Sequence, residues 1–198
     1  ESLNSTYNLG TIGTIQYQSC LVGYPFTSSS PNWRKSSMER RNKPTPVNYR
    51  TEANGNLPYD GNLMKGLQIR QPFQNGALEN TIVFNFSTAG YKKIKFSFAA
   101  LDELSGVTGI SIDYSVNSGT PNWISTGLTA TSMPLFSAYQ LFQNDFSSIT
   151  EVNDNANFKV RLQFTGSNMT LDNGKNITFN NIAVDGVKLP TSFTVGYT

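Results

Sequence analysis

The sequence lacks histidine entirely, and its 198 residues include a single cysteine, Cys20. Without histidine the chain cannot form a serine–histidine or cysteine–histidine nucleophile pair, nor a zinc site with histidine ligands. A single cysteine cannot form a disulfide within the chain, so we expect Cys20 to be a small buried residue near the end of a strand. Carboxylates therefore remain as the main side chains available for catalysis.

Charged residues and long apolar runs are also scarce. Only 14% of the residues are charged, and the net charge of +2 is too small to indicate a polyanion partner by itself. No apolar run approaches the ~20 residues that a membrane-spanning helix needs. The chain begins with Glu1 rather than methionine, as expected if an export signal has been removed or the chain trimmed. We expect an extracellular or cell-surface protein that neither binds nucleic acid nor inserts into a membrane.

Apolar and polar residues alternate in a series of segments between Leu78 and Val184. The clearest segments are residues 81–86, 93–98, 110–115 and 158–164. A period of two places one face of a strand in a core and the other in water. The sequence therefore predicts an all-β fold, a β-sandwich. At this length the chain fits one domain, residues 1–198, with its regular strands in residues 66–187.

The region before residue 66 is less regular. Residues 14–19 alternate and predict one early strand. Residues 27–56 are rich in Ser, Pro, Asn and Arg, which indicates a long, loop-dominated excursion. Structureless loops longer than ~15 residues in a compact domain are usually functional or disordered, so this excursion is the first place to look for a site. Residues 135–149 mix periods and fit either a strand with a bulge or a short helix.

Basic residues are concentrated within this excursion. Five of the chain's 15 basic residues lie between Arg34 and Lys43, with Trp33 immediately before them. An indole ring beside guanidinium groups can stack on a sugar ring and pair with sulfate or uronate groups. Two other interpretations stay open: Trp33 packs under the loop while the arginines form a solvated rim, or the segment contacts a partner protein domain. Nucleic acid is disfavoured, because no further basic stripe accompanies the cluster.

The second tryptophan, Trp123, follows a predicted hairpin tip. It is either a core residue at the start of a strand or an exposed platform for a sugar. If the chain binds a glycan, we expect the aromatic side chains to stack on sugar faces and the arginines to donate charge-assisted hydrogen bonds. The expected contact set is Trp33, Arg34, Arg40, Arg41, Tyr59 and Trp123.

The order of strands and turns resembles a known family. The runs that carry the resemblance are NTIVFNFSTAGYKKIKFSFAALDELSG, ISIDYSVNSGTPNW, NDNANFKVRLQFTG and NITFNNIAVDG, which lie in residues 66–187. They resemble a jelly-roll module of secreted Bacteroidetes proteins, many of them exported by the type IX system. The resemblance implies a jelly-roll β-sandwich of two antiparallel sheets. It also implies an accessory domain that binds or displays within a large surface protein, with no particular reaction.

Acidic residues near strand ends are candidate calcium ligands, because related jelly rolls gather oxygen ligands there. The candidates are Asp102, Glu103, Asp154 and Asp185. The family usually has an Asp-Asn-Ile step in its closing strand, whereas this sequence has Asn180, Asn181 and Ile182. This departure weakens the expectation of a structural calcium ion, and no other cofactor is expected.

The acidic residues form no recognisable catalytic pair. A glycosidase needs two carboxyl groups about 5–9.5 Å apart across a cleft. Asp102 and Glu103 are adjacent, and neighbours in an extended strand point to opposite faces. We therefore expect no enzyme but a non-catalytic extracellular binding module that recognises a carbohydrate or a cell surface and serves adhesion or targeting within a larger secreted protein. The alternative is a structural or docking spacer that contacts other protein domains of a secretion or motility apparatus; a third is a carboxylate-dependent polysaccharide lyase or hydrolase.

Overall fold

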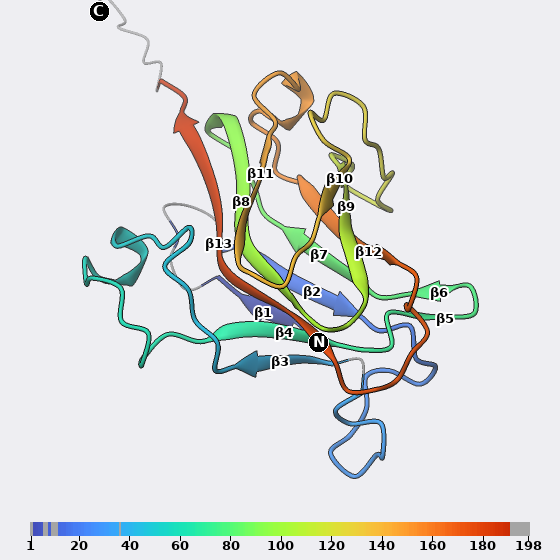
Figure 1. Cartoon of the computed structure of the whole chain (residues 1–198). Helices are drawn as coiled ribbons and strands as arrows, with labels where there is room; N and C mark the ends of the chain where they lie inside the picture. The colour runs from blue at the N-terminus through green and yellow to red at the C-terminus, as the bar shows by residue number, and fades with distance from the viewer. Residues whose placement is uncertain (1, 6–7, 9–11, 36, 191–198) are drawn as a thin grey trace, which may run out of the picture.

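The computed structural model describes residues 2–5, 8, 12–35 and 37–190. Two antiparallel sheets face each other and form a jelly-roll β-sandwich (Figure 1). The alternating pattern predicted the sandwich, and the family resemblance implied the jelly roll. Within the described residues there is no α-helix, only two 3-10 turns, η1 (Glu52–Asn54) and η2 (Thr150–Val152). None of the described helices is long and apolar enough to cross a membrane.

The strands are distributed over one large sheet, a second sheet and a small hairpin. The six-stranded sheet has the order β1 (Ser2–Asn4), β2 (Thr14–Gln18), β7 (Thr81–Asn85), β12 (Lys159–Gly166), β9 (Val107–Ser115) and β10 (Ser132–Pro134). The five-stranded sheet has the order β11 (Gln140–Asp145), β8 (Tyr91–Glu103), β13 (Asn176–Lys188), β4 (Gly66–Arg70) and β3 (Met38–Arg41). The hairpin pairs β5 (Gln74–Asn75) with β6 (Leu78–Glu79).

Aromatic side chains fill the space between the two sheets. Phe84 of β7 contacts Phe96 of β8, with ring centroids 4.8 Å apart, so the contact crosses from one sheet to the other. Phe98 of β8 stacks on Phe142 of the neighbouring strand β11, with centroids 5.0 Å apart. Burying each such side chain contributes roughly 1.5–3 kcal/mol, so these phenylalanines account for much of the stability of the sandwich.

The alternation in β12 separates a core face from a solvent face. Val160 and Leu162 are fully buried, whereas Arg161 and Gln163 between and after them are only partly buried. Strand β7 repeats this pattern, whereas residues 96–101 of β8 and 176–180 of β13 are buried on both faces. Each sheet still has one side toward the core and one side away from it. The sandwich therefore presents two separate outer faces, one on each sheet.

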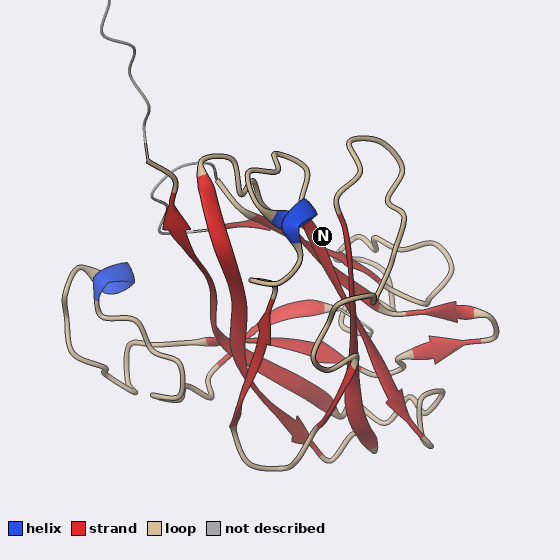
Figure 2. Ribbon diagram, turned by 90° about the horizontal axis from the view of Figure 1, so that it is seen from above, coloured by secondary structure: helices blue, strands red, loops and turns tan. Residues whose placement is uncertain are grey.

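The excursion expected over residues 27–56 contains more regular structure than the sequence indicated. Met38–Arg41 forms the edge strand β3, which pairs with β4, and η1 follows later in the segment. Figures 1 and 2 show residues 42–65 projecting to one side of the sandwich. The Asn181 amide nitrogen ties the start of this loop to β13 by donating to the carbonyl oxygens of Thr45 (2.8 Å) and Val47 (2.7 Å).

Other local expectations can be compared directly. Residues 14–18 form β2, as predicted, and the ambiguous segment 135–149 contains strand β11 rather than an α-helix. Cys20 is fully buried, and its thiol donates to the carbonyl oxygen of Pro72 at 3.3 Å, which confirms its expected role as a core residue.

Candidate binding site

A groove lies along the β3–β4 edge of the five-stranded sheet. Its volume is about 420 Å³, within the range of small-ligand sites. Four arginines and one glutamate lie among the lining residues, so the groove carries a clear excess of positive charge. We call it the cationic groove. Its lining residues are Arg34, Glu39, Arg40, Arg41, Asn42, Gln68 and Arg70.

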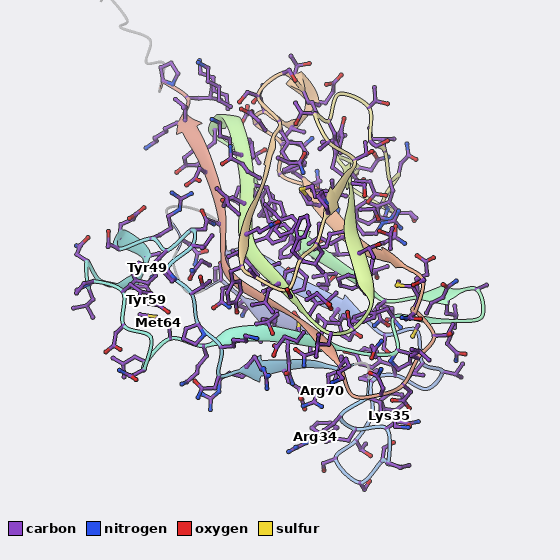
Figure 3. All side chains as sticks on the ribbon, viewed as in Figure 1. Arg34, Lys35, Tyr49, Tyr59, Met64 and Arg70 are labelled. Carbon is purple, nitrogen blue, oxygen red and sulfur yellow. The ribbon has the colours of Figure 1, made fainter. Side chains whose placement is uncertain are left out.

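The pairing of β3 with β4 explains why these side chains meet. Met38 lies opposite Ile69, and both are buried in the core. Because side chains alternate along a strand, Glu39 then lies on the outer face, opposite Gln68. Figure 3 shows Arg34, from the loop before β3, close to Arg70 at the end of β4. The edge strand therefore joins the basic segment of the sequence to polar residues of β4.

Glu39 organises one wall of the cationic groove. Its carboxylate accepts hydrogen bonds from Gln68 Nε2 at 2.7 Å and from Arg70 Nε at 3.1 Å. Arg34 Nε lies farther away, 3.9 Å from the second carboxylate oxygen. Gln68 is 3% exposed, and its Oε1 has no hydrogen-bond partner. A buried acceptor without a partner is unusual, and a donor supplied by a ligand or a water would stabilise it.

Glu103, at the end of β8, holds the next arginine in place. Arg41 binds its carboxylate in a bidentate manner, at 3.0 Å through Nε and 2.5 Å through Nη2. Lys43 Nζ (3.2 Å) and the Thr178 hydroxyl (2.6 Å) also donate to it. Burial opposes ionisation of Glu103, but the hydrogen bonds from Arg41, Thr178 and Lys43 outweigh it and lower its pKa to about 2. Glu103 is therefore a fixed anion that orients Arg41.

The polar network continues across the outer face of the five-stranded sheet. Tyr139 donates to the carbonyl oxygen of Lys43 and accepts a hydrogen bond from Asn180 Nδ2 at 2.6 Å. Burial raises the pKa of Tyr139, with further contributions from Glu103 and Tyr59, so Tyr59 lies near this network. Tyr59 packs edge-to-face against Tyr49 with centroids 5.5 Å apart, and Figure 3 shows this pair well away from Arg34.

The expected glycan-contact set is only partly brought together. Arg34, Arg40 and Arg41 line the cationic groove. Trp33 directly precedes Arg34 and is 41% exposed. Tyr59 lies in the loop of residues 42–65, near Tyr49 and Tyr139, and does not line the groove. Trp123 is separated from all of these.

Trp123, in the loop between β9 and β10, lies against the six-stranded sheet. Its ring lies over the guanidinium of Arg161, 4.6 Å from the ring centroid, and Arg161 is on the outer face of β12. Residue types alone grouped Trp123 with Arg34, Arg40 and Arg41, but the fold places Trp123 on the other sheet. Conversely, sequence reasoning missed Glu39, Gln68 and Arg70, because only the pairing of β3 with β4 brings them to the groove.

The four candidate calcium ligands do not form one site. Asp102 and Glu103 lie at one end of β8, whereas Asp185 pairs with Lys95 and the Asp154 backbone donates to Tyr91 at the other end. Asp102 accepts from the Ser105 backbone, Asp154 from the Gly90 backbone, and Asp185 from Arg50. Among the described residues, no group of three His, Cys, Asp or Glu side chains could hold a metal ion.

Comparisons with known proteins find similarity only in structure. No protein-family model matches the sequence, and no curated protein matches it. A structure described as "CBM4 structure and function" has a TM-score of 0.41 and 15% identity, over 62% of this chain and 70% of that one. The CBM22-1 xylan-binding domain of Xyn10C from Paenibacillus barcinonensis has a TM-score of 0.42 and 11% identity, over 64% and 74%. The N-terminal cellulose-binding domain of β-1,4-glucanase C from Cellulomonas fimi has a TM-score of 0.39 and 16% identity, over 63% and 80%. Similarity at this level carries no conclusion about what this chain binds.

Proposed function

We propose that this chain is a non-catalytic extracellular module that binds an acidic carbohydrate in the cationic groove. In this role it serves adhesion or targeting within a larger secreted protein. The observation that carries the proposal is the groove lining itself: four guanidinium groups and one carboxylate in a space of about 420 Å³. A groove with this excess of positive charge attracts carboxylate or sulfate groups and disfavours cations.

Two of the four guanidinium groups are available to a ligand. The Arg40 side chain is exposed and makes no hydrogen bond or ion pair with another described residue. The Arg34 side chain is 75% exposed, and its nearest carboxylate oxygen, on Glu39, is 3.9 Å away. A guanidinium presents a planar fork of donors that matches uronate or sulfate oxygens. Arg41 and Arg70, fixed by Glu103 and Glu39, supply positive charge at constant positions.

Trp33 is the aromatic residue nearest to the groove lining in sequence. It is 41% exposed and directly precedes Arg34, but it is not itself one of the lining residues. An indole ring offers a large rigid surface with little conformational entropy to lose on binding. Stacking on a sugar ring beside an arginine contact would combine apolar and charged recognition in one ligand.

The carboxylates at the groove support binding rather than catalysis. A general acid needs a pKa near the working pH, whereas the pKa of Glu103 is lowered to about 2. Glu39 is engaged by Gln68 and Arg70. Each carboxylate thus serves as an anchor for the arginines that would bind the ligand.

Calorimetric titration with soluble polysaccharides tests the proposal. The panel is polygalacturonate, a sulfated galactan and a neutral glucan. We expect an acidic polysaccharide to bind and Arg40→Ala to weaken it about tenfold, which is about 1.4 kcal/mol. The matched control is Lys188→Ala, which removes one exposed positive charge at the far end of β13. Equal weakening by both variants would reveal unspecific attraction, and no binding of either acidic polysaccharide would refute the proposal.

A second candidate function, docking to a neighbouring protein domain, is favoured by one observation. Leu57 and Leu63, in the loop between η1 and β4, are 60% and 72% exposed. Two exposed leucines near the Tyr49–Tyr59 pair are suited to a protein contact. This function predicts that none of the polysaccharides binds, and that a Leu57→Ser, Leu63→Ser variant loses its contact with the adjacent domain of the parent protein in a pull-down.

A further inference from the structure

A second groove crosses the outer face of the six-stranded sheet. Its volume is about 430 Å³, close to that of the cationic groove. Its described lining comes from β1, β2 and β7, and no side chain among these described residues is charged. We call it the neutral groove. The lining residues are Ser2, Gln16, Tyr17, Gln18, Thr81 and Val83.

The neutral groove lies on the opposite side of the sandwich from the cationic groove. Tyr17 and Ile82, paired across β2 and β7, are buried in the core. Side chains alternate along a strand, so Gln16, Gln18 and Val83 occupy the outer face of this sheet. The cationic groove instead lies on the five-stranded sheet. A ligand in one groove therefore leaves the other accessible.

The strand register links the neutral groove to Trp123. Gln16 of β2 pairs with Val83 of β7, and Val83 pairs with Arg161 of β12. Neighbouring strands are about 4.8 Å apart, so this row carries from Gln16 to Arg161 over about 10 Å. Trp123 lies over the Arg161 guanidinium at 4.6 Å and is partly exposed. The backbone position of Arg161, whose guanidinium Trp123 covers, is thus two strand spacings from that of Gln16.

The one charged residue of this row, Arg161, is neutralised by a partner. It binds Asp113 in a bidentate manner, at 3.0 Å and 2.5 Å. Gln163, also on the outer face of β12, donates to Glu79 at 2.8 Å, and Glu79 keeps its charge. The neutral groove and this row therefore offer a ligand amides and hydroxyls beside a satisfied ion pair. Within the described part of the chain, the Gln16 side chain makes no hydrogen bond, and its amide offers both a donor and an acceptor.

We propose that the neutral groove and Trp123 form a second carbohydrate site, which takes a neutral glycan chain. Trp123 stacks on one sugar ring, and Gln16, Gln18 and Thr81 hydrogen-bond hydroxyls of the sugars that follow. A neutral polyhydroxyl ligand fits because the lining is uncharged and the nearest ion pair is already satisfied. An acidic ligand gains nothing here, since Asp113 occupies the guanidinium of Arg161. The proposal stands apart from the function of the cationic groove, because it rests on different residues of the other sheet.

Native affinity electrophoresis in gels that contain single neutral polysaccharides tests this site. The panel is a β-1,3-glucan, a β-1,4-glucan, a mannan and a xylan. We expect at least one to retard the protein, Trp123→Ala to weaken that binding at least tenfold and Gln16→Ala to weaken it severalfold. Arg40→Ala, in the cationic groove, is the matched control and leaves neutral binding unchanged.

The outcomes separate the two sites. Because Trp123→Ala also removes packing on Arg161, Gln16→Ala provides a second variant at an exposed position, and thermal melts check that both fold. Severalfold weaker binding of the neutral polysaccharide by Gln16→Ala, with an unchanged melting temperature, supports the second site. If no neutral polysaccharide retards the protein, or if Arg40→Ala abolishes neutral binding, the second site is refuted. In either case, binding of an acidic polysaccharide that only Arg40→Ala weakens in the calorimetric titration would still support the cationic groove.

Discussion

Replacing Glu103 with glutamine tests how the network behind the cationic groove is held together. The pKa of Glu103 is lowered from 4.5 to about 2, because the hydrogen bonds from Arg41, Thr178 and Lys43 outweigh the effect of burial. The difference between these pKa values corresponds to about 3 kcal/mol of folding free energy at neutral pH. The Glu103 side chain is 11% exposed, but Arg41 and Lys43 are 39% and 42% exposed. Since solvent screens those partners, we expect Glu103→Gln to destabilise the protein by about 2 kcal/mol at pH 7.

The pH dependence follows from the direction of the shift. A carboxylate whose pKa is lowered on folding stabilises the native state above its unfolded pKa, here 4.5. That stabilisation is lost as the pH falls toward 2. Wild type and Glu103→Gln should therefore differ by about 4–8 °C in melting temperature at pH 7, and by less than half of that at pH 3.

Thermal and urea unfolding, followed by circular dichroism at pH 7, 5, 4 and 3, measure this difference. The control is Glu79→Gln, which alters an exposed carboxylate that accepts a hydrogen bond from Gln163. It should cost less than about 0.5 kcal/mol at every pH. An equal loss of stability in Glu103→Gln at pH 3 and pH 7 would show that the effect is steric, and no loss at pH 7 would show that Arg41 is not held by charge.

Two further substitutions test how the fold positions the groove. Gly66→Ala should destabilise the protein by about 1–3 kcal/mol in urea unfolding, because the new Cβ would lie 2.5 Å from Asn180 Nδ2 and 3.0 Å from the Phe179 carbonyl oxygen. The control is Gly76→Ala, where nothing lies within 4 Å of the new Cβ but φ is +58°. It separates the steric effect from backbone strain. Asn181→Ala should remove the two hydrogen bonds that hold the carbonyl oxygens of Thr45 and Val47. Amide hydrogen exchange should then rise in residues 42–50 while the core strands stay protected. An equal rise in exchange across both sheets would contradict a local anchor.

The strands that the sequence predicted are those with a core on one side. In β7, in residues 110–114 of β9 and in residues 159–164 of β12 every second residue is apolar and buried, so the period of two is visible without any knowledge of the partner strand. Strand β3 was not predicted, because Met38 is its only apolar residue. An edge strand with a single inward anchor has no period to detect. Its existence depends on pairing with β4, which is a tertiary contact.

The same limit explains what could be foreseen of the cationic groove. Arg34, Arg40 and Arg41 are close in sequence, so their concentration of charge is visible in the residues alone. Gln68 and Arg70 come from a strand more than 25 residues later and appear unremarkable in sequence. No local pattern marks Gln68 as a buried side chain with an unpaired acceptor, since its burial results from β3 and β13 on either side. A sequence therefore reveals a cluster of charge more readily than the wall that shapes it.

The separation of Trp123 from the arginines has a general physical reason. In a sandwich, alternation gives each sheet an outer face that shares no side chains with the other, because the core lies between them. Residue types suited to one ligand can thus stand on opposite faces, and each face must be judged by its own charge. The five-stranded face has arginines in excess, whereas on the six-stranded face Arg161 is neutralised by Asp113. Added salt should therefore lower the affinity of a ligand for the cationic groove and leave the affinity of a ligand for the neutral groove nearly unchanged. The reason is that salt screens net charge and has little effect on satisfied ion pairs or amide hydrogen bonds.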